Sequence, residues 1–316
     1  GTFLAQVVAN VFPDRTGALL LDAVVDPAWA SGPAGTISWA REHADQASWS
    51  TLRRFFRLCD QAGRERCSFA AGRPQAKYAA LAARLRHDPI HVRVPGQGRQ
   101  VLGYPDLVGD TLSGLYNSFK WPLLADLLQA ADVGDRRTLG RLLAQLGEPS
   151  TPTYDNYRDV GLAITCGDTD NPGRFGRYAE VARTRDARVA PYFGSIWAYH
   201  PMVCAAWTGR STERYTGPWT PRTTQPVLLI TSRHDPATPY RNARKVARLI
   251  PNSALITVDG VGHGGLFASS CAARLATRYL LTRATPEPGT RCKPDITPFG
   301  AAAPSHRPVA IPQALQ

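Results

Sequence analysis

The sequence predicts an α/β protein in which a parallel sheet with crossover helices is interrupted by a long helical segment. A helical pattern and then a continuous apolar run stand near the amino terminus, and strand and helix patterns alternate after residue 225. Such alternation is typical of a parallel sheet. Between these stretches, residues 31–215 are mostly helical and rich in arginine.

The first element is a helix over residues 2–12, where Phe3, Leu4 and Val7 recur at helical spacing. The following "FPDR" ends it, because proline cannot continue a helix. "ALLLDAVVDP" comes next, and its apolar length suits a buried parallel strand over residues 18–25. The chain therefore begins with a helix and then a strand.

The middle of the chain reads as a series of helices. "SWSTLRRFFRLCDQ" carries one apolar stripe, and "KWPLLADLLQAADVGDRRTLGRLLAQL" predicts two helices around a "VGD" break. Pro122 suits the first turn of the earlier one. No internal repeat is visible.

Strand and helix alternate again in the last third. We expect strands over 226–231 and 254–258, each followed by an amphipathic helix, "YRNARKVARLI" and "SSCAARLATRYLL". The tail, residues 300–316, lacks periodicity and is predicted to be disordered.

Composition limits the class of protein. Of 316 residues, 43% are hydrophobic and 20% charged, which suits a folded protein, and no run is long and apolar enough for a membrane span. The formal net charge is +12, but the arginines are scattered and no nucleic-acid-binding motif is present. We therefore expect no nucleic acid partner, and salt-dependent retention on DNA would test that alternative.

Two ionisable residues follow consecutive predicted strands. Asp235 stands just past the first, in "VLLITSRHDPATP", and His263 just past the second, in "LITVDGVGHGG". The carboxyl ends of parallel strands meet at one edge of the sheet, where ligands bind. We expect Asp235 to lie beside His263 and to orient it as a general base.

Other interpretations of these residues stay open. A lone histidine on a glycine-rich loop often has no task, and Asp26, just past the first strand, is a second acid candidate. Thr238 and Pro239 suit an ordinary helix start, with Thr238 as the N-cap. We prefer that to a substrate role for Thr238.

Six cysteines are present, with no C-x-x-C pair and no zinc-finger spacing, so no metal site is expected. In an extracellular chain they would form three disulfides with 15 possible connectivities. Six reduced, buried thiols are the alternative.

The segment from "HDPATPYRNARKVARLI" to "GVGHGGLFASSCAARLATRYLL" resembles the carboxyl-terminal region of the tripeptidyl-aminopeptidase-like α/β-hydrolases, secreted serine peptidases and esterases related to prolyl aminopeptidases. "GTFLAQVVANVFPDRTGALLLDAVVDP" resembles the helix after their nucleophile and the next strand, and "AITCGD" and "CAAW" resemble parts of their cap. The resemblance runs from Gly1 to about Pro298.

This resemblance implies a partial α/β-hydrolase fold, without its amino-terminal strands, and a large helical cap. Core residues would be 1–30 and 216–299, the cap 31–215 and the tail 300–316. The family's nucleophile lies in G-x-S-x-G, and Gly1 matches the last glycine, so the serine would precede the chain. We therefore expect the chain alone to be inactive and to fold poorly. Ser113 and Ser195, in the cap, are expected to be structural.

The implied function is that of a secreted, cell-surface or periplasmic serine hydrolase that cleaves near free peptide amino termini and needs no cofactor. Ester hydrolysis, or a non-catalytic fragment, is the alternative. Asp155, Asp159 and Asp168 are candidate ligands for a substrate ammonium group. With sequential pairing, which keeps each loop short, we expect the disulfides Cys59–Cys67, Cys166–Cys204 and Cys271–Cys292; the second is also suggested by the cap motifs.

Overall fold

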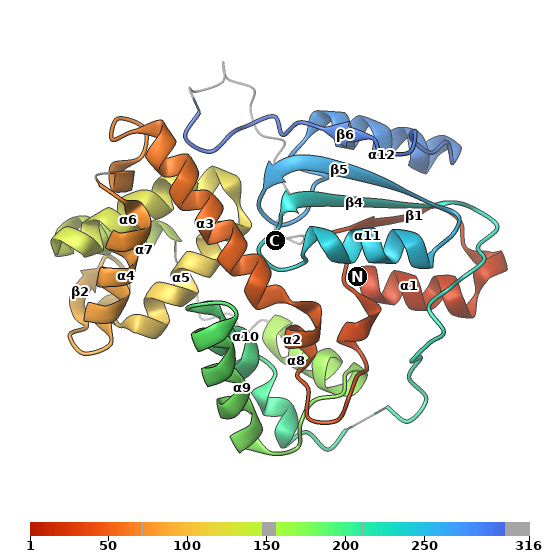
Figure 1. Ribbon diagram of the computed structural model, residues 1–316, viewed down its shortest axis with the longest axis horizontal. Coiled ribbons are helices and arrows are strands. Elements are labelled where there is room, and N and C mark those ends of the chain that lie inside the picture. Colours follow the sequence, from red (N-terminus) through yellow and green to blue (C-terminus); the bar gives the residue numbers. More distant parts are fainter. Residues whose placement is uncertain (71, 147–155, 210, 301–316) are drawn as a thin grey trace.

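The main sheet has four parallel strands in the order β1-β4-β5-β6 (Figure 1). The computed structural model describes residues 1–70, 72–146, 156–209 and 211–300. The strands are β1 (Leu19–Asp22), β4 (Val227–His234), β5 (Ser253–Val261) and β6 (Arg291–Cys292). The predicted α/β class is confirmed. Within the described residues, β1 pairs with β4 alone, so its other edge is open.

Helices cover both faces of this sheet: α1 (Thr2–Val11), α11 (Tyr240–Leu249) and α12 (Ser270–Thr282). Alternate residues of β4 pack on opposite sides. Leu229 lies in one apolar cluster with Val246 of α11, and Ile230 lies in another with Ala276 of α12. Because both faces are covered, β4 reads as an unbroken apolar run rather than an alternating one.

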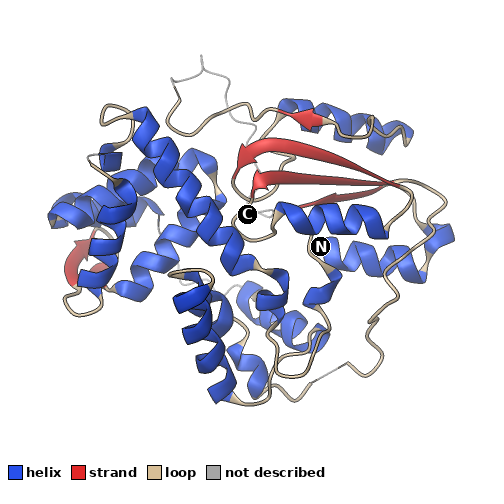
Figure 2. Cartoon of the chain, viewed as in Figure 1, coloured by secondary structure: helices blue, strands red, loops and turns tan. Residues whose placement is uncertain are grey.

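The chain between β1 and β4 forms a mainly helical insertion that lies beyond the carboxyl ends of the strands (Figures 1 and 2). Its helices are α2 (Ser38–Glu42), α3 (Ala44–Ala62), α4 (Pro74–Leu85), α5 (Tyr104–Tyr116), α6 (Trp121–Val133), α7 (Arg136–Leu146), α8 (Tyr157–Asp168), α9 (Phe175–Arg188) and α10 (Phe193–Tyr199). The two helices expected around "VGD" are α6 and α7, and Pro122 stands in the first turn of α6. We keep the name cap for this insertion.

Short 3₁₀ helices complete the fold: η1 (Pro13–Arg15), η2 (Pro27–Trp29), η3 (Ser68–Ala70), η4 (Ser118–Lys120) and η5 (Met202–Ala205). In the cap, an antiparallel hairpin of β2 (Ile90–Val94) and β3 (Gly98–Leu102) interrupts the helices. This hairpin was not among the elements expected from the sequence. Ile90, Val92 and Val94 are buried while the residues between them are exposed, a period of two that fits a half-buried strand.

Aromatic rings link the first core helix to the cap. Phe3 of α1 lies 5.2 Å from Trp29, which lies 5.8 Å from Trp39, and Trp39 lies 5.0 Å from Trp197 of α10 (centroid distances). We call these four residues the aromatic row. Each such pair stabilises the fold by about 0.5–1.5 kcal/mol beyond its buried area.

Three disulfides join Cys59 to Cys67, Cys166 to Cys204 and Cys271 to Cys292, the pairs expected from the sequence. The first lies within the cap and the second joins α8 to η5. The third joins α12 to β6, which has only two residues and pairs with β5 through Thr257 and Val258. Because β6 is so short, no apolar pattern in the sequence could predict it.

The strand boundaries differ from the expected ones in both directions. β1 is shorter, since Ala23 adopts a left-handed conformation at φ 61°. β4 and β5 are longer. β4 continues through Thr231 and Ser232, which are fully buried, because the Ser232 hydroxyl donates to the carbonyl of Gly264.

Residues 301–316, nearly all of the tail expected to be disordered, lie outside the described residues. Within the described ranges, no helix combines the length and the apolar character that a membrane crossing requires.

Candidate active site

Asp235 and His263 lie at neighbouring strand ends, as the sequence predicts. β4 ends at His234 and β5 at Val261, and both strands point toward the cap (Figure 1). Nδ1 of His263 lies 3.0 Å from Oδ1 and 3.1 Å from Oδ2 of Asp235. The crossover helix α11 therefore returns the chain to the position that brings the two side chains together.

The carboxylate of Asp235 is fully buried and held by four further donors. Its Oδ1 accepts the backbone N–H groups of Ala237 (2.8 Å) and Thr238 (2.9 Å). Its Oδ2 accepts the hydroxyl of Thr238 at 2.9 Å and the N–H of Gly264 at 3.0 Å. Burial by itself would raise the pKa of Asp235, but His263 and these donors hold it below its ordinary value of 3.8.

Glycines flank His263 because the loop must turn in tight space. Gly262 has φ 100° and Gly264 has φ 77°, values that side chains other than glycine rarely adopt. A Cβ on Gly262 would lie 2.9 Å from the carbonyl oxygen of Tyr116, and that oxygen accepts the N–H of His263 at 2.8 Å. The loop thus fixes the backbone of His263 against the end of α5.

The ring of His263 remains partly accessible to solvent. Its side chain is 35% exposed, and its ring lies 4.9 Å from that of Tyr116. Within the described ranges no residue hydrogen-bonds to Nε2. Burial would lower the pKa of His263, but Asp235 raises it above 6.5. In the tautomer whose Nδ1–H points at Asp235, the lone pair of Nε2 is free, as a general base requires.

Comparison with known proteins covers the part of the chain that holds this pair. Residues 190–292, which hold both Asp235 and His263, match the model of an α/β-hydrolase family described as TAP-like protein. This chain carries a TAP-like α/β-hydrolase domain.

Curated relatives of this TAP-like chain include peptidases and an esterase. "Serine protease Hip1" of Mycobacterium tuberculosis is 28% identical over 311 residues, covering 92% of this chain and 56% of the relative. "Carboxylesterase B" of the same species is 28% identical over 296 residues, covering 90% and 53%. "Tripeptidyl aminopeptidase" of Streptomyces lividans is 25% identical over 310 residues, covering 94% and 54%. The TAP-like chain thus spans about half the length of these relatives.

Asp26, the second acid candidate, does not contact His263 and has other partners. Its carboxylate pairs with Lys245 at 2.7 and 2.8 Å and accepts the N–H of Ala28 at 2.9 Å, which caps η2. The residue near the site is Asp22, the last residue of β1. It accepts N–H groups from Gly265 and Leu266, next to His263. Asp22 was not among the residues expected at the site, because it lies inside the apolar run "LLLDAVV".

Thr238 does not cap a helix, so our expectation that it is the N-cap of the following helix was wrong. The helix α11 begins at Tyr240, its N-cap is Pro239, and no side chain caps it. The segment "DPATP" instead folds back on Asp235, so the Thr238 hydroxyl donates to that carboxylate. Thr238 follows Asp235 by three residues, and this short spacing was the signal in the sequence for a contact between their side chains.

The remaining candidates fall in the cap. Ser113 is exposed on α5, and Ser195 on α10 donates its N–H to Asp186. Asp155 lies outside the described residues. Asp159 and Asp168 belong to α8, and burial raises the pKa of Asp168 against the opposing effect of Arg214.

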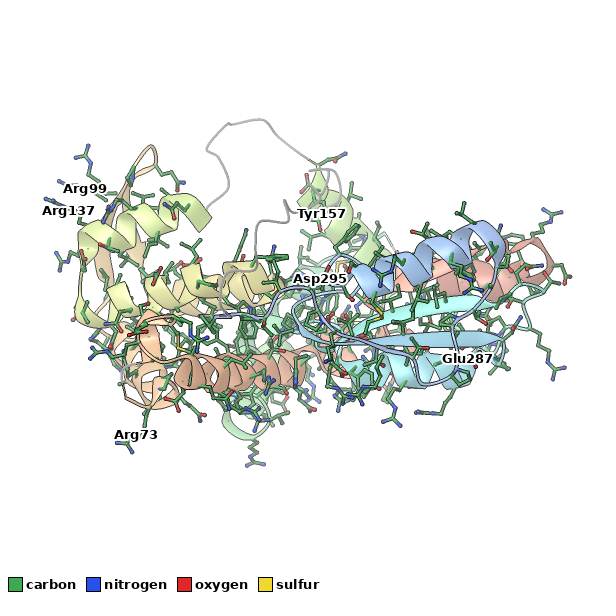
Figure 3. All side chains as sticks on the ribbon, turned by 90° about the horizontal axis from the view of Figure 1, so that it is seen from above. Arg73, Arg99, Arg137, Tyr157, Glu287 and Asp295 are labelled. Atoms are coloured by element: carbon green, nitrogen blue, oxygen red, sulfur yellow. A yellow bond between two sulfur atoms is a disulfide. The ribbon has the colours of Figure 1, made fainter. Side chains whose placement is uncertain are left out.

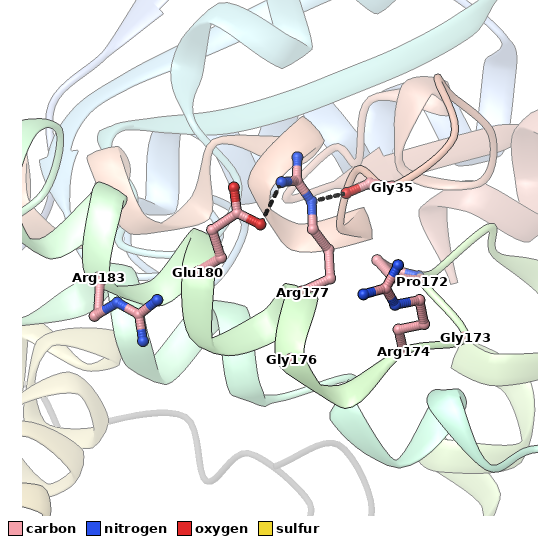
Figure 4. A pocket seen from close by; sticks show the side chains of 8 residues that line it. All are labelled: Gly35, Pro172, Gly173, Arg174, Gly176, Arg177, Glu180 and Arg183. Carbon is pink, nitrogen blue, oxygen red and sulfur yellow. Dashed lines mark hydrogen bonds and ion pairs between the residues drawn. The ribbon is translucent and has the colours of Figure 1, made fainter.

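A cavity of about 670 Å³ in the cap shares no residue with the pair Asp235–His263. It is lined by Arg174, Arg177 and Arg183 of the α9 region, and Arg177 pairs with Glu180 (Figure 4). Figure 3 labels three further arginines of the cap, Arg73, Arg99 and Arg137. No group of three or more His, Cys, Asp and Glu side chains suited to a metal ion occurs in the described part of the chain.

Proposed function

We propose that this chain supplies the acid and the base of a serine hydrolase that releases short peptides or residues from free peptide amino termini. The supporting observation is the contact of Asp235 with Nδ1 of His263, which leaves Nε2 free at the carboxyl edge of the sheet. Relatives named as a serine protease and as tripeptidyl aminopeptidases support the peptidase class. Peptides are accordingly the proposed substrates.

The proposed chemistry passes through an acyl-enzyme. Nε2 of His263 takes the proton of a serine hydroxyl while the serine oxygen attacks the scissile carbonyl carbon. The bond to the leaving amine breaks, and His263 gives that amine the proton. Water then attacks the acyl ester with His263 again as base, which releases the acid and regenerates the serine. Asp235 keeps Nδ1 protonated and stabilises the imidazolium.

We place the nucleophilic serine in a segment that precedes Gly1. In the resemblance stated above, α1 is the helix that follows the nucleophile, and Gly1 is its N-cap. The open edge of β1 offers a place for a further strand from such a segment. On this proposal the chain alone is inactive and exposes an edge that favours self-association.

We assign to the cap the restriction of cleavage to the amino termini of substrate peptides. The cap connects β1 to β4 over more than 200 residues, far beyond an ordinary loop, and stands over the strand ends that carry the site. A substrate ammonium group enclosed there needs a carboxylate or carbonyl partner, because an unpaired charge is costly to bury. Asp155, Asp159 and Asp168 are the cap carboxylates to test first.

Location outside the cytoplasm is part of the same proposal. Three disulfides join all six cysteines, and such bonds persist in oxidising compartments. We therefore propose that the protein is secreted or held at the cell surface or in the periplasm.

Carboxylic-ester hydrolysis is the second candidate, favoured by the relative named carboxylesterase B. The same acid and base would serve it, since only the leaving group differs. A test uses the protein as encoded, that is, with the segment that we propose precedes Gly1. Its substrate is one peptide anilide whose amino terminus is either free or acetylated. Loss of cleavage on acetylation supports the aminopeptidase, whereas equal kcat/KM with ester turnover supports the esterase.

A fluorophosphonate probe, which needs an activated serine, tests the serine-hydrolase class itself. We expect labelling of the protein as encoded, none of the 316-residue chain, and none of His263→Ala. Labelling of the chain alone would place the nucleophile inside it and overturn the upstream assignment. Full labelling of His263→Ala would overturn the role of His263.

A further inference from the structure

Asp22 contacts the loop that carries His263. Its Oδ1 accepts the N–H of Gly265 at 2.7 Å, and its Oδ2 accepts the N–H of Leu266 at 3.1 Å. Asp22 ends β1, whereas the loop follows β5, and β4 lies between these strands. The carboxylate therefore bridges the end of the central strand and ties two non-adjacent parts of the sheet together.

The contact forms part of a continuous set of backbone hydrogen bonds around His263. The N–H of His263 donates to the carbonyl of Tyr116, and the N–H of Gly264 donates to Asp235. The next two N–H groups donate to Asp22. Four consecutive N–H groups are thus fixed by three acceptor residues, and a Cβ on Gly264 would lie 2.9 Å from Oδ2 of Asp22.

We propose that Asp22 is a positioning residue: its carboxylate holds the backbone after His263, so that Nδ1 stays on Asp235 and Nε2 stays aimed at the nucleophile. This inference rests on the proposed role of His263 as the general base. Asp22 does not touch the reacting atoms and acts only through His263. Precise placement matters, because displacement of a catalytic group by about 1 Å costs on the order of 100-fold in rate.

Charge supports the same role. Burial raises the pKa of Asp22, while the N–H groups of Gly265 and Leu266 oppose that rise. The ionisable groups that face His263 are Asp235 from the end of β4, Asp22 from the end of β1 and Tyr116 from α5. Both carboxylates favour the imidazolium that forms when His263 takes a proton.

The test compares Asp22→Asn and Asp22→Ala with Asp26→Asn in the protein as encoded. Asp26 lies only four residues further along and pairs with Lys245, so it is a matched control outside the site. Labelled histidine gives the pKa of His263 by NMR. We expect it to fall in both Asp22 variants and to stay unchanged in Asp26→Asn. Fluorophosphonate labelling should slow by about 10- to 100-fold in the Asp22 variants alone.

An unchanged His263 pKa and labelling rate in Asp22→Asn would overturn the inference, as would a loss of thermal stability alone. Should the variants not fold, the unmodified protein still answers: the amide protons of Gly265 and Leu266 must shift with the titration of a carboxylate. If they do not, the inference fails. These NMR readouts need no turnover, so failure of the proposed function, seen as an active His263→Ala, remains a separate result.

Discussion

The hydroxyl of Thr238 donates a hydrogen bond of 2.9 Å to Oδ2 of Asp235, the carboxylate that faces His263. Both residues are buried, and the Thr238 N–H donates to the other oxygen of the same carboxylate. This arrangement restrains the orientation of the carboxylate that contacts Nδ1 of His263. A residue that sequence patterns assign to a helix start thus contacts the proposed acid directly.

Replacing Thr238 by valine keeps the shape of the side chain and removes its donor. Hydrogen bonds to charged groups are worth about 1.5–3 kcal/mol, so we expect kcat/KM to fall by about 10- to 100-fold. The pKa of Asp235 should rise, since a donor to its charged form is lost. Thr238→Ser keeps the hydroxyl and should retain most activity. Equal activity of the valine and serine variants would contradict this.

Activity should require neutral His263 and therefore increase with pH. Asp235 raises the pKa of His263 above 6.5, so the acid limb of kcat/KM should have its midpoint above that value. In Asp235→Asn the attraction is lost, and we expect the midpoint to move to lower pH and kcat to fall by about 10⁴-fold. A midpoint that Asp235→Asn leaves in place would exclude the pairing.

The free energy of unfolding should depend on pH through Asp235 and His263, and the two dependences should have opposite signs. The folded-state pKa of Asp235 is depressed, so its contribution is present above 3.8 and is lost as the pH falls through the folded pKa. The folded-state pKa of His263 is raised, so its contribution is present below 6.5 and is lost as the pH rises through the folded pKa. Urea unfolding of the wild type and of Asp235→Asn, between about pH 3 and about pH 9, measures both contributions. The same pH dependence of the free energy of unfolding in the two proteins would contradict this prediction.

The disulfides should contribute according to the loops that they close. Cys166–Cys204 spans 38 residues and Cys59–Cys67 spans 8. Loop-closure entropy predicts losses of about 3.9 and about 2.5 kcal/mol on removal. Paired cysteine-to-serine variants, compared by urea unfolding under non-reducing conditions, measure the difference. A larger loss for the 8-residue loop would show that packing, not chain entropy, dominates.

The ion pair of Asp45 with Arg185 joins α3 to α9 inside the cap. The Asp45 side chain is fully buried and accepts from Arg185 Nη2 at 2.7 Å. Asp45→Ala removes a buried carboxylate from the partly buried guanidinium of Arg185 and should destabilise the protein by about 1.5–3 kcal/mol, the worth of a hydrogen bond between charged groups. Glu180→Gln, which breaks the exposed pair with Arg177, should change stability little. Thermal unfolding of both variants tests this; equal losses would refute it.

Local patterns predicted the elements that bury their own apolar faces. The apolar runs over 226–231 and 254–258 predict strands that overlap β4 and β5, and the order of these strands along the chain places Asp235 beside His263. Strand ends were less predictable. Ser232 looks like the end of a strand, yet β4 continues through it, because its hydroxyl bonds to Gly264 from a loop 32 residues away.

Contacts between distant segments were beyond the sequence. Asp22 meets Gly265 across 243 residues, and nothing in "LLLDAVV" distinguishes it from an ordinary strand end. The hairpin β2–β3 was missed for a different reason. Its five-residue strands carry only a short alternating pattern, and the helices around it dominated the interpretation.

The aromatic row from Phe3 to Trp197 has a spectroscopic consequence. Three of its four members are tryptophans, with neighbouring rings 5.0 to 5.8 Å apart. Indoles this close exchange excitation energy, so their emission depends on their mutual spacing. Trp29 lies beside the core and Trp197 on the cap helix α10, and a small tilt of one against the other would alter that exchange. Intrinsic tryptophan fluorescence would therefore report a change in the position of α10 relative to the core, and no attached dye is needed.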